Sequence, residues 1–454
     1  MQYYSTNLQA PRVGFREALL QGQAPDRGLY MPVTIPPIPA ETILSYRRME
    51  YADIAFDVIR RFVNQEIDNT VLEALVQDAY NFPVPLEKVE EDRYVMRLDR
   101  GPTASFKDFA ARMMGRLMQH FLKESGRSLL ILTATSGDTG SAVANAFYGL
   151  ENIRVVVLFP KDEVTDRQRR QMTTLGRNVH VLALDAKFDD CQALVKQAFA
   201  DPGLRHLELS SANSINIGRL VPQSVYYFYA WSRLAPPGGS VVFSVPSGNF
   251  GDMMGGILAM KMGLPVERFI IATNANDEFP NYLQSGIYEK IEPSRNCISS
   301  AMNVGHPSNL ARLVALYGGV MDEKGAIHRQ ANLEAMRRDL FPVSVTDDET
   351  RETIRTVYRN HGVILEPHGA VGWAGLQACL SQCPDITGRV CISLETAHPA
   401  KFPDEIRRLV NVDPTLPPSL EGLDGREEFV TAIEADYGSF RKYLLDSFRG
   451  EPEV

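Results

Sequence analysis

The stretch SLLILTATSGDTGSA (residues 128–142) joins an apolar run to a glycine-containing turn and then to small residues that suit a helix. Such a succession is typical of a β-strand followed by an α-helix. Similar β-favouring runs occur at residues 129–132, 154–159, 179–184, 241–245, 269–273, 363–365 and 390–394. Helical patterns follow several of these runs, so the sequence predicts an α/β fold with a mostly parallel sheet and helices on both faces.

The first 80 residues have a different pattern. Helical periodicity covers residues 15–21, 49–63 and 71–80, with a proline-rich bend between the first two, and NFPVP (81–85) then ends the pattern. We therefore predict a mainly helical N-terminal domain over residues 1–80 and a second region over residues 81–454. Helical periodicity at residues 426–450 predicts a C-terminal helical appendage.

Composition narrows the classes of function. The chain has 454 residues and a formal net charge of −9, which disfavours binding to nucleic acid and to anionic membrane surfaces. We expect no membrane partner, because no apolar run approaches the length of a span and the N-terminus lacks the apolar core of a signal peptide. The five cysteines form no CxxC pair and the eight histidines form no HExxH motif, so we expect no metal site and a reducing, cytoplasmic location.

The turn at residues 136–140 is the first candidate binding loop, because ligands collect at the carboxyl ends of parallel strands. Ser136, Gly137 and Thr139 have small side chains and would offer backbone N–H groups at a helix start. Such a turn suits a carboxylate or a phosphate. A tight strand-to-helix turn capped by Asp138 explains the same residues equally well.

A second candidate loop is PSGNFGD (246–252), which follows a β-favouring run. It matches neither the dinucleotide motif GxGxxG nor the nucleoside-triphosphate motif GxxxxGK[ST]. Backbone N–H groups at the following helix start would still cradle a phosphate, with an ordinary capped turn as the alternative. Asp252 would repel a phosphate, so we expect its N–H to bind while its side chain caps the helix or turns away.

The third candidate loop is ISLETAHPAKF (392–402), in which Thr396 leaves a strand end shortly before Lys401. A hydroxyl can hydrogen-bond a ring nitrogen, although a surface turn would have the same sequence pattern. The segment EPHGAVG (366–372) has a similar form. Its glutamate and histidine could take part in acid–base chemistry, but they more simply form a turn.

A lysine stands at an unfavourable place in SFKDFAARMM (105–114). Ser105 and Asp108 have the spacing of a capping box, which places Lys107 in the first helical turn, where the helix dipole disfavours a cation. Lys107 is either a solvent-facing lysine or one that works as a neutral amine or an imine. Together with the three loops, the second reading predicts pyridoxal phosphate, which needs a lysine, a phosphate cradle and a partner for its ring nitrogen.

Six segments, in this order, resemble the motifs of the threonine synthases: GPTASFKDFAARMM, TATSGDTGSA, SANSINIGRL, PSGNFGD, EPHGAVG and ETAHPAKF. The resemblance extends from near residue 1 to beyond residue 402, and the set is specific although each motif alone is not. It implies two three-layer α/β/α lobes with mostly parallel sheets around a pyridoxal-phosphate cleft, plus the helical N-terminal domain. The smaller lobe would cover about residues 105–215, and the larger lobe would take the rest of residues 81–454.

The resemblance also implies residue roles. Lys107 would bind the cofactor covalently and act as the catalytic base. The cofactor would further be held by Gly248, Asn249, Phe250 and Asp252 at its phosphate and by Thr396 at its pyridine nitrogen. The substrate α-carboxylate would lie on Ser136, Gly137, Asp138 and Thr139. The remaining substrate candidates are Asn213, Asn216 and Arg219, with Arg219 as the partner of a phosphate.

The implied activity is conversion of O-phospho-L-homoserine and water to L-threonine and phosphate, by γ-elimination and β-addition of water, in a monomer or homodimer. Two alternatives remain. One is another enzyme of the same fold and cofactor, such as a serine or threonine dehydratase or a cysteine synthase; the GNFGD and TAHPAKF segments and the N-terminal region favour threonine synthase over it. The other is a non-catalytic relative that binds a phosphate metabolite or a protein, against which Lys107 argues.

Overall fold

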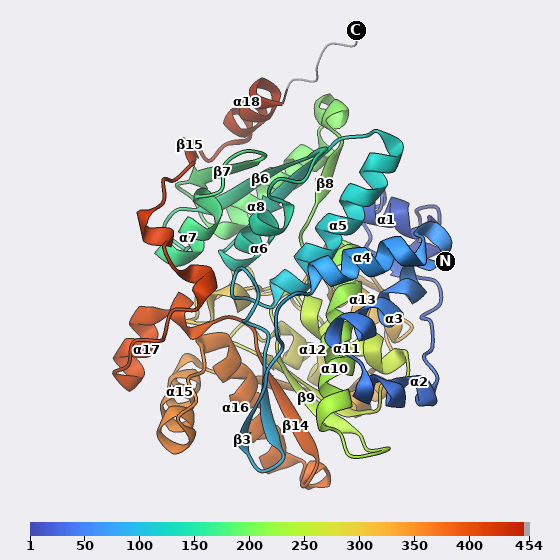
Figure 1. Cartoon of the computed structure of the whole chain (residues 1–454), viewed down its shortest axis with the longest axis vertical. Coiled ribbons are helices and arrows are strands. Elements are labelled where there is room, and N and C mark those ends of the chain that lie inside the picture. Colours follow the sequence, from blue (N-terminus) through green and yellow to red (C-terminus); the bar gives the residue numbers. More distant parts are fainter. Residues whose placement is uncertain (449–454) are drawn as a thin grey trace.

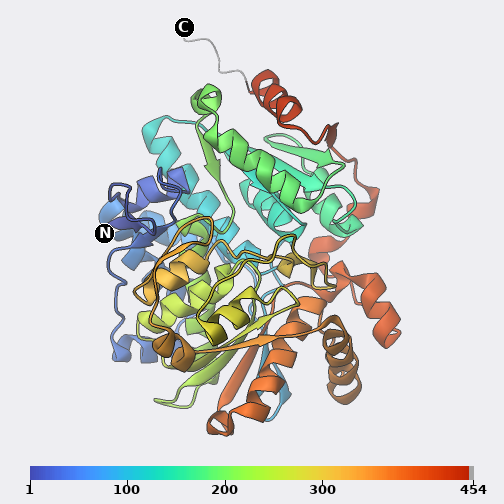
Figure 2. The same ribbon diagram turned by 180° about the vertical axis from the view of Figure 1, so that it is seen from behind.

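The computed structural model of the chain describes residues 1–448 and contains two main β-sheets, each covered by helices on both faces (Figures 1 and 2). A five-stranded sheet lies in the upper half of Figure 1 and a six-stranded sheet lies in the lower half. The N-terminal helices lie together along one side of the molecule. The predicted α/β fold, with two mostly parallel sheets and a mainly helical N-terminal region, is confirmed.

The five-stranded sheet is wholly parallel, with the strand order β15-β7-β6-β5-β8. Its strands are β5 (Leu129–Ala134), β6 (Ile153–Pro160), β7 (Val179–Leu184), β8 (Leu209–Ser211) and β15 (Thr431–Ile433). In β6, Val155 and Val157 face the main core while Val156 and Leu158 face a second apolar cluster. Burial on both faces explains why these strands appear in the sequence as continuous apolar runs.

The six-stranded sheet has the order β13-β10-β9-β14-β4-β3 and is parallel except for the edge strand β3, which is antiparallel to β4. Its strands are β3 (Leu86–Glu90), β4 (Arg93–Arg97), β9 (Val241–Pro246), β10 (Val266–Thr273), β13 (Leu340–Ser344) and β14 (Val390–Glu395). Two small antiparallel ribbons pair β1 (Tyr3–Ser5) with β2 (Tyr30–Pro32) and β11 (Val320–Met321) with β12 (Ile327–Arg329).

Helices complete the layers. The five-stranded sheet is flanked by α5 (Lys107–Ser125), α6 (Asp138–Phe147), α7 (Asp166–Thr173), α8 (Phe188–Ala200) and α18 (Tyr437–Ser447). The six-stranded sheet and its surroundings carry α9 (Ile217–Leu220), α10 (Val225–Leu234), α11 (Gly251–Lys261), α12 (Glu278–Ser285), α13 (Leu310–Leu316), α14 (Leu333–Asp339), α15 (Asp347–His361), α16 (Pro367–Gln382) and α17 (Pro403–Val410). No helix within residues 1–448 combines the length and apolar composition needed to cross a membrane.

Two expectations for local structure are wrong. Residues 363–365 form no strand; they connect α15 to α16, with Val363 and Leu365 buried in the core cluster beneath these helices and Ile364 half-buried against it. Residues 426–450 are not helical throughout, because β15 precedes α18, and residues 449–450 lie outside the described part. Since β15 pairs with β7, this segment joins the five-stranded sheet, whereas the predicted division placed it in the larger lobe.

The N-terminal region supports the helix that begins at Lys107. Its helices are α1 (Phe15–Gln21), α2 (Ala40–Ser45), α3 (Tyr51–Val63) and α4 (Asn69–Ala79). The ring of Phe109 on α5 contacts the rings of Tyr51 and Tyr80 at centroid distances of 5.5 Å and 6.3 Å. Tyr80 Oη also donates to the carbonyl oxygen of Phe109 at 3.1 Å. The first 80 residues therefore share one continuous core with both sheets.

Arg312 on α13 ties this region to a loop of the cavity described below. Its side chain is fully buried, and burial lowers the pKa of its guanidinium to about 9. Nε and Nη2 donate to the carbonyl oxygen of Tyr30 at 3.2 Å and 3.1 Å. Nη1 donates to the carbonyl of Ser214 at 3.0 Å and Nη2 to that of Ile215 at 2.7 Å. The Arg312 side chain thus connects α13 to the strand residue Tyr30 and to the loop that contains Ser214 and Ile215.

We predict that Arg312→Lys lowers the free energy of unfolding by about 2–4 kcal/mol, because an ammonium cannot supply the planar set of N–H donors that these carbonyls require. The measurement is urea denaturation, with a lower midpoint and an unchanged slope. Arg329→Lys is the control, since the exposed Arg329 side chain donates to a single carbonyl among residues 1–448, that of Gly318, and its effect should stay within about 0.5 kcal/mol. Equal effects of the two substitutions would contradict the assignment.

Candidate active site

One cavity lies between the two sheets, where the carboxyl ends of β5, β9 and β14 meet the start of α5. Many residues selected from the sequence line it: Lys107, Ser136, Asp138, Thr139, Arg219, Gly248, Asn249, Asp252 and Thr396. Residues as far apart in the chain as Lys107 and Thr396, 289 positions, therefore meet, as expected for the strand ends of parallel sheets. Gly137, Asn216 and Phe250 lie beside these residues without lining the cavity.

The helix of Lys107 does not begin with the predicted capping box. Its N-cap is Phe106, which makes no side-chain cap bond, and Ser105 Oγ is buried without a hydrogen-bond partner among the described residues. The carboxylate of Asp108 instead accepts from Thr103, from the backbone N–H at 2.8 Å and from Oγ1 at 2.6 Å. The Asp108 carboxylate therefore binds the loop before the helix and does not take part in capping the first turn of α5.

That loop is hydrogen-bonded to the segment that carries Thr396. The N–H of Phe106 donates to the carbonyl oxygen of Thr396 at 2.9 Å, and the N–H of His398 donates to that of Ala104 at 3.0 Å. Ser105 and Ala397 form an antiparallel bridge between these two bonds. The backbone thereby fixes the start of α5 relative to the end of β14.

The surroundings of Lys107 disfavour the protonated form of its amine. Burial lowers the pKa of its ammonium, and the positive charges of Arg219 and Lys401 lower it further. Asp138 and Asp252 act in the opposite direction, but the nearest approach to Asp138, Nζ to Oδ2, is 4.0 Å. The amine is therefore placed among charges without a short ion pair to keep it protonated.

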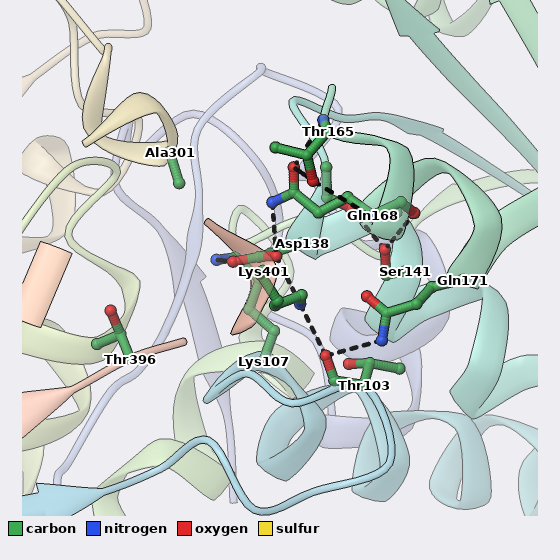
Figure 3. Close-up of polar contacts among 12 residues, drawn as sticks. Thr103, Lys107, Asp138, Ser141, Thr165, Gln168, Gln171, Ala301, Thr396 and Lys401 are labelled. Atoms are coloured by element: carbon green, nitrogen blue, oxygen red, sulfur yellow. Dashed lines mark hydrogen bonds and ion pairs between the residues drawn. The ribbon is translucent and has the colours of Figure 1, made fainter. Parts of the chain in front are cut away.

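The turn after β5 begins α6 at a glycine that no other residue could replace without strain. Gly137, the N-cap, has φ +129°, and a Cβ there would lie 2.5 Å from the side chain of Gln168. Asp138 does not cap the helix, contrary to the simpler expectation. Its buried Oδ1 accepts from Gln168 Nε2 at 2.8 Å and from Lys401 Nζ at 2.7 Å (Figure 3).

The turn after β9 places backbone N–H groups at the start of α11. Phe250 takes the left-handed conformation, with φ +62°, and its ring packs edge-on against Phe279 with a centroid distance of 5.0 Å. Such strain in a buried non-glycine residue is typical of functional loops. A Cβ on Gly248 would lie 3.0 Å from the carbonyl of Ala301, so the backbone is closely approached here.

Asp252 does not turn away from the cavity. Its Oδ1 accepts from the N–H of Met253 at 3.0 Å, and the residue lines the cavity at 4% exposure. Burial raises the pKa of Asp252 to about 6, although the bond from Met253 and the charge of Lys107 oppose this. The carboxylate can thus take up a proton near neutral pH when an anion lies beside it.

Thr396 and His368 are connected through Glu366. His368 Nε2 accepts the N–H of Ala301 at 3.0 Å, so its Nδ1 carries the hydrogen that is donated to Glu366 Oε2 at 2.5 Å. Thr396 Oγ1 lies 3.4 Å from Glu366 Oε1, which is a long contact for a hydroxyl donor. Both ring nitrogens of His368 are engaged and Glu366 caps α16, which favours a structural role for these two residues.

The SANSINIGRL segment divides into lining and supporting residues. Arg219 lines the cavity; its Nη1 donates to the carbonyl of Ala212 at 2.7 Å, while its buried Nε has no partner among the described residues. Asn213 also lines the cavity. Asn216 is fully buried and caps α9 instead, with its side-chain N–H groups donating to carbonyls, including that of Leu19 at 2.8 Å.

Residues 300–304 also line the cavity and were missed from the sequence. Asn274, at the end of β10, holds this segment by donating from Nδ2 to Asn303 Oδ1 at 3.0 Å and to Ser299 Oγ at 3.1 Å. The polar run TNAND (273–277), directly after a predicted strand, was the signal that could have identified Asn274.

The donor set fits pyridoxal phosphate. Lys107 supplies an amine of lowered pKa, the first turn of α11 supplies amides that lack intrahelical acceptors, and Thr396 supplies a hydroxyl at a strand end. The guanidinium of Arg219 on the cavity wall adds a positive charge for a second anion. An amine beside two anion sites can move protons next to a carboxylate and a leaving phosphate.

Comparison with known proteins agrees with this chemistry. Residues 2–80 match the family model for the threonine synthase N terminus, residues 79–395 that for pyridoxal-phosphate-dependent enzymes, and residues 369–444 that for the threonine synthase C-terminal region. The chain is 37% identical to threonine synthase of Pseudomonas aeruginosa, with all of both chains covered. It is 36% identical to that of Escherichia coli, covering 98% of this chain and 100% of the relative.

Solved structures give the same picture. Threonine synthase of Brucella melitensis with bound pyridoxal phosphate superimposes with a TM-score of 0.91 at 38% identity, covering 99% of this chain and 100% of that one. The yeast enzyme gives a TM-score of 0.89 at 31% identity, with 98% of each chain covered. Maize serine racemase, at 16% identity and a TM-score of 0.54, shares the fold alone, with 72% of this chain and 92% of that one covered.

We predict that Asp252→Asn stabilises the cofactor-free protein in a pH-dependent way. Asp252 has a pKa of about 6 in the folded protein, whereas aspartate in an unfolded chain titrates near ~3.9. Below the lower value both states are protonated and the substitution is neutral; above the higher value the buried charge destabilises the fold. The gain should therefore rise from near zero at about pH 4 to a few kcal/mol, on the order of 3, above about pH 7.

Urea denaturation across this pH range measures the gain. Asp162→Asn, on the exposed surface after β6, serves as the control and should change stability by less than about 0.5 kcal/mol throughout. A gain from Asp252→Asn of equal size at both ends of the range would show that Asp252 is not held with a raised pKa.

Proposed function

Because this chain belongs to the threonine synthase family and is a pyridoxal-phosphate-dependent lyase, we propose that it converts O-phospho-L-homoserine and water to L-threonine and phosphate. The observation that carries this proposal is that Lys107, the turn before α11 and Thr396 border one cavity, together with Arg219. When bound, pyridoxal phosphate draws electrons from the substrate Cα and so stabilises the carbanion that proton loss leaves there.

We propose that Lys107 holds the cofactor between turnovers and is the base during them. As a neutral amine it removes the proton from the substrate Cα, and it then carries protons to and from Cβ and Cγ while phosphate leaves Cγ and water adds at Cβ. Burial and two neighbouring cations lower its pKa, which supports this role because a protonated lysine accepts no proton.

The anion sites have separate roles in this proposal. Residues Ser136–Thr139 bind the substrate α-carboxylate through their N–H groups and hydroxyls. Gly248, Asn249, Phe250 and Asp252 hold the cofactor phosphate at the start of α11, and Thr396 faces the ring nitrogen. Arg219 binds the phosphate that leaves Cγ, a role supported by its place on the cavity wall and by its positive charge beside Lys107. Asn216, which lies beside the cavity without lining it, caps α9 and so positions Arg219.

We further propose that residues 1–80 are a domain that supports α5, and that the chain works in the cytoplasm as a monomer or homodimer. Its partners are small molecules, without nucleic acid or membrane. The net charge of −9 supports the absence of a nucleic-acid partner.

A product assay tests the reaction. Purified protein supplied with cofactor should release phosphate from O-phosphohomoserine and form threonine in equal amounts, and it should show the visible absorption of a lysine-bound cofactor. Lys107→Ala should lose this absorption and at least about 10³-fold in rate, because both the attachment and the base are removed. Deamination of serine without formation of threonine would instead favour a dehydratase, and absence of both reactions a non-catalytic binding protein.

Substitution of Arg219 tests the assigned phosphate partner. Arg219→Met should lower kcat/KM for O-phosphohomoserine by about 10²-fold and weaken inhibition by inorganic phosphate similarly, because a charge-assisted pair is lost. Arg219→Lys should retain part of both. If phosphate inhibits Arg219→Met as strongly as the unmodified enzyme, the leaving group binds elsewhere.

A further inference from the structure

A second buried lysine lies beside the cavity. Lys401 is the last residue of a short 3₁₀ helix (Pro399–Lys401) that follows β14, and it has no exposed surface. Its Nζ donates to the carbonyl oxygen of Thr103 at 2.7 Å and lies 2.7 Å from Asp138 Oδ1. A lysine is almost never fully buried without a charged partner, and Asp138 is that partner for Lys401.

Asp138 is shared between two lysines, but unequally. Lys401 Nζ and Gln168 Nε2 both donate to Oδ1, at 2.7 Å and 2.8 Å, while Oδ2 lies 4.0 Å from Lys107 Nζ (Figure 3). Gln168 is itself fixed, because its Oε1 accepts from the N–H of Thr165 at 3.2 Å. The carboxylate is therefore held against Lys401 and away from contact with Lys107.

We propose that Lys401 is a positioning residue, which engages Asp138 as its own ion-pair partner and thereby leaves Lys107 available as an uncharged amine. The proposal rests on the function proposed above for Lys107. It also explains why the loop that is proposed to bind the substrate carboxylate contains an acidic residue. Because Asp138 is paired with Lys401, its negative charge is compensated and does not repel the substrate.

The charges around Lys107 agree in sign with this role. Facing it are Asp138 from α6, Asp252 from α11, Arg219 from α9 and Lys401. Burial makes the largest contribution to the lowered pKa of Lys107; Arg219 and Lys401 add to it and the two carboxylates oppose it. On its own helix, Asp108 is occupied by Thr103. Loss of Lys401 would remove one cation and free Asp138 to approach Lys107, and both changes favour the ammonium.

Lys401 also joins three segments that come from different parts of the fold: the end of β14, the start of α6 and the loop before α5. A purely structural clamp would have the same contacts. The two roles differ in what they predict for the pKa of Lys107. Loss of a purely structural contact leaves this pKa unchanged, whereas loss of the ion-pair partner of Asp138 raises it.

The experiment is acetylation of the cofactor-free full-length protein with a small excess of acetic anhydride over a range of pH, with labelling at Lys107 quantified by mass spectrometry. Only the neutral amine reacts, so the midpoint of the profile follows the pKa of Lys107. In Lys401→Met the midpoint should move to higher pH, with labelling at about pH 8 reduced at least about threefold. Lys161→Met is the control, because Lys161 forms an exposed pair with Asp185 at 2.9 Å, and its profile should match the wild type.

Two further variants keep the test decisive if the lone buried carboxylate of Lys401→Met impairs folding. Asp138→Asn should shift the Lys107 midpoint to lower pH. The double variant Lys401→Met with Asp138→Asn removes both charges and should return labelling to the wild-type level or above it. Unchanged labelling in Lys401→Met, or a double variant that stays as weakly labelled as Lys401→Met, would overturn the proposal and leave Lys401 as a clamp.

The loaded enzyme provides a second measurement. The acidic limb of the pH profile of kcat should move to higher pH in Lys401→Met, in the same direction as the labelling midpoint, because kcat reports the enzyme–substrate complex, in which the released amine of Lys107 must lose its proton to act as the base. Failure of the proposed function would appear differently: Lys107→Ala would keep its activity, while acetylation of Lys107 would still respond to Lys401.

Discussion

The arrangement of this protein depends on one electrostatic constraint: the pKa of the buried amine of Lys107 is held below its ordinary value although carboxylates lie beside it. Burial alone lowers the pKa of Lys107, but burial among carboxylates would reverse the effect. Two features limit the effect of the neighbouring carboxylate of Asp138: its distance from Lys107 and its ion pair with Lys401. Asp138 approaches Lys107 no closer than 4.0 Å, and its nearer partner is Lys401.

The remaining parts of the fold hold that amine in place. Hydrogen bonds between residues 104–106 and 396–398 fix the start of α5 to the end of β14, and aromatic rings of the N-terminal region pack around Phe109. Arg312 holds the loop that precedes Arg219. The helix dipole, which makes the first turn a poor place for a cation, acts in the same direction as burial. Burial and the helix dipole thus both disfavour the charged form of Lys107.

Much of this was predictable from the sequence. Continuous apolar runs identified β5, β6, β7, β9, β10 and β14, because strands buried on both faces need apolar residues on each. Glycine turns and small polar residues after those runs identified the loops of the cavity. The edge strands β3, β8, β13 and β15 were missed, and so was β4 beside β3, since partly exposed or very short strands carry little apolar signal. The apolar run at 363–365 was assigned as a strand because burial in a connection gives the same composition.

By itself the sequence determined which residue types gather at the strand ends, and so the α/β fold, the cofactor class and most of the cavity wall. Only the tertiary structure decided how those residues are paired. Asp108 binds Thr103 instead of capping its helix, Asp138 binds Lys401, and Asn216 supports a turn outside the cavity. These pairings join positions up to 263 residues apart in the chain, from Asp138 to Lys401. The physical reason is that the protonation of a buried group depends on its neighbours in space, which local sequence patterns do not record.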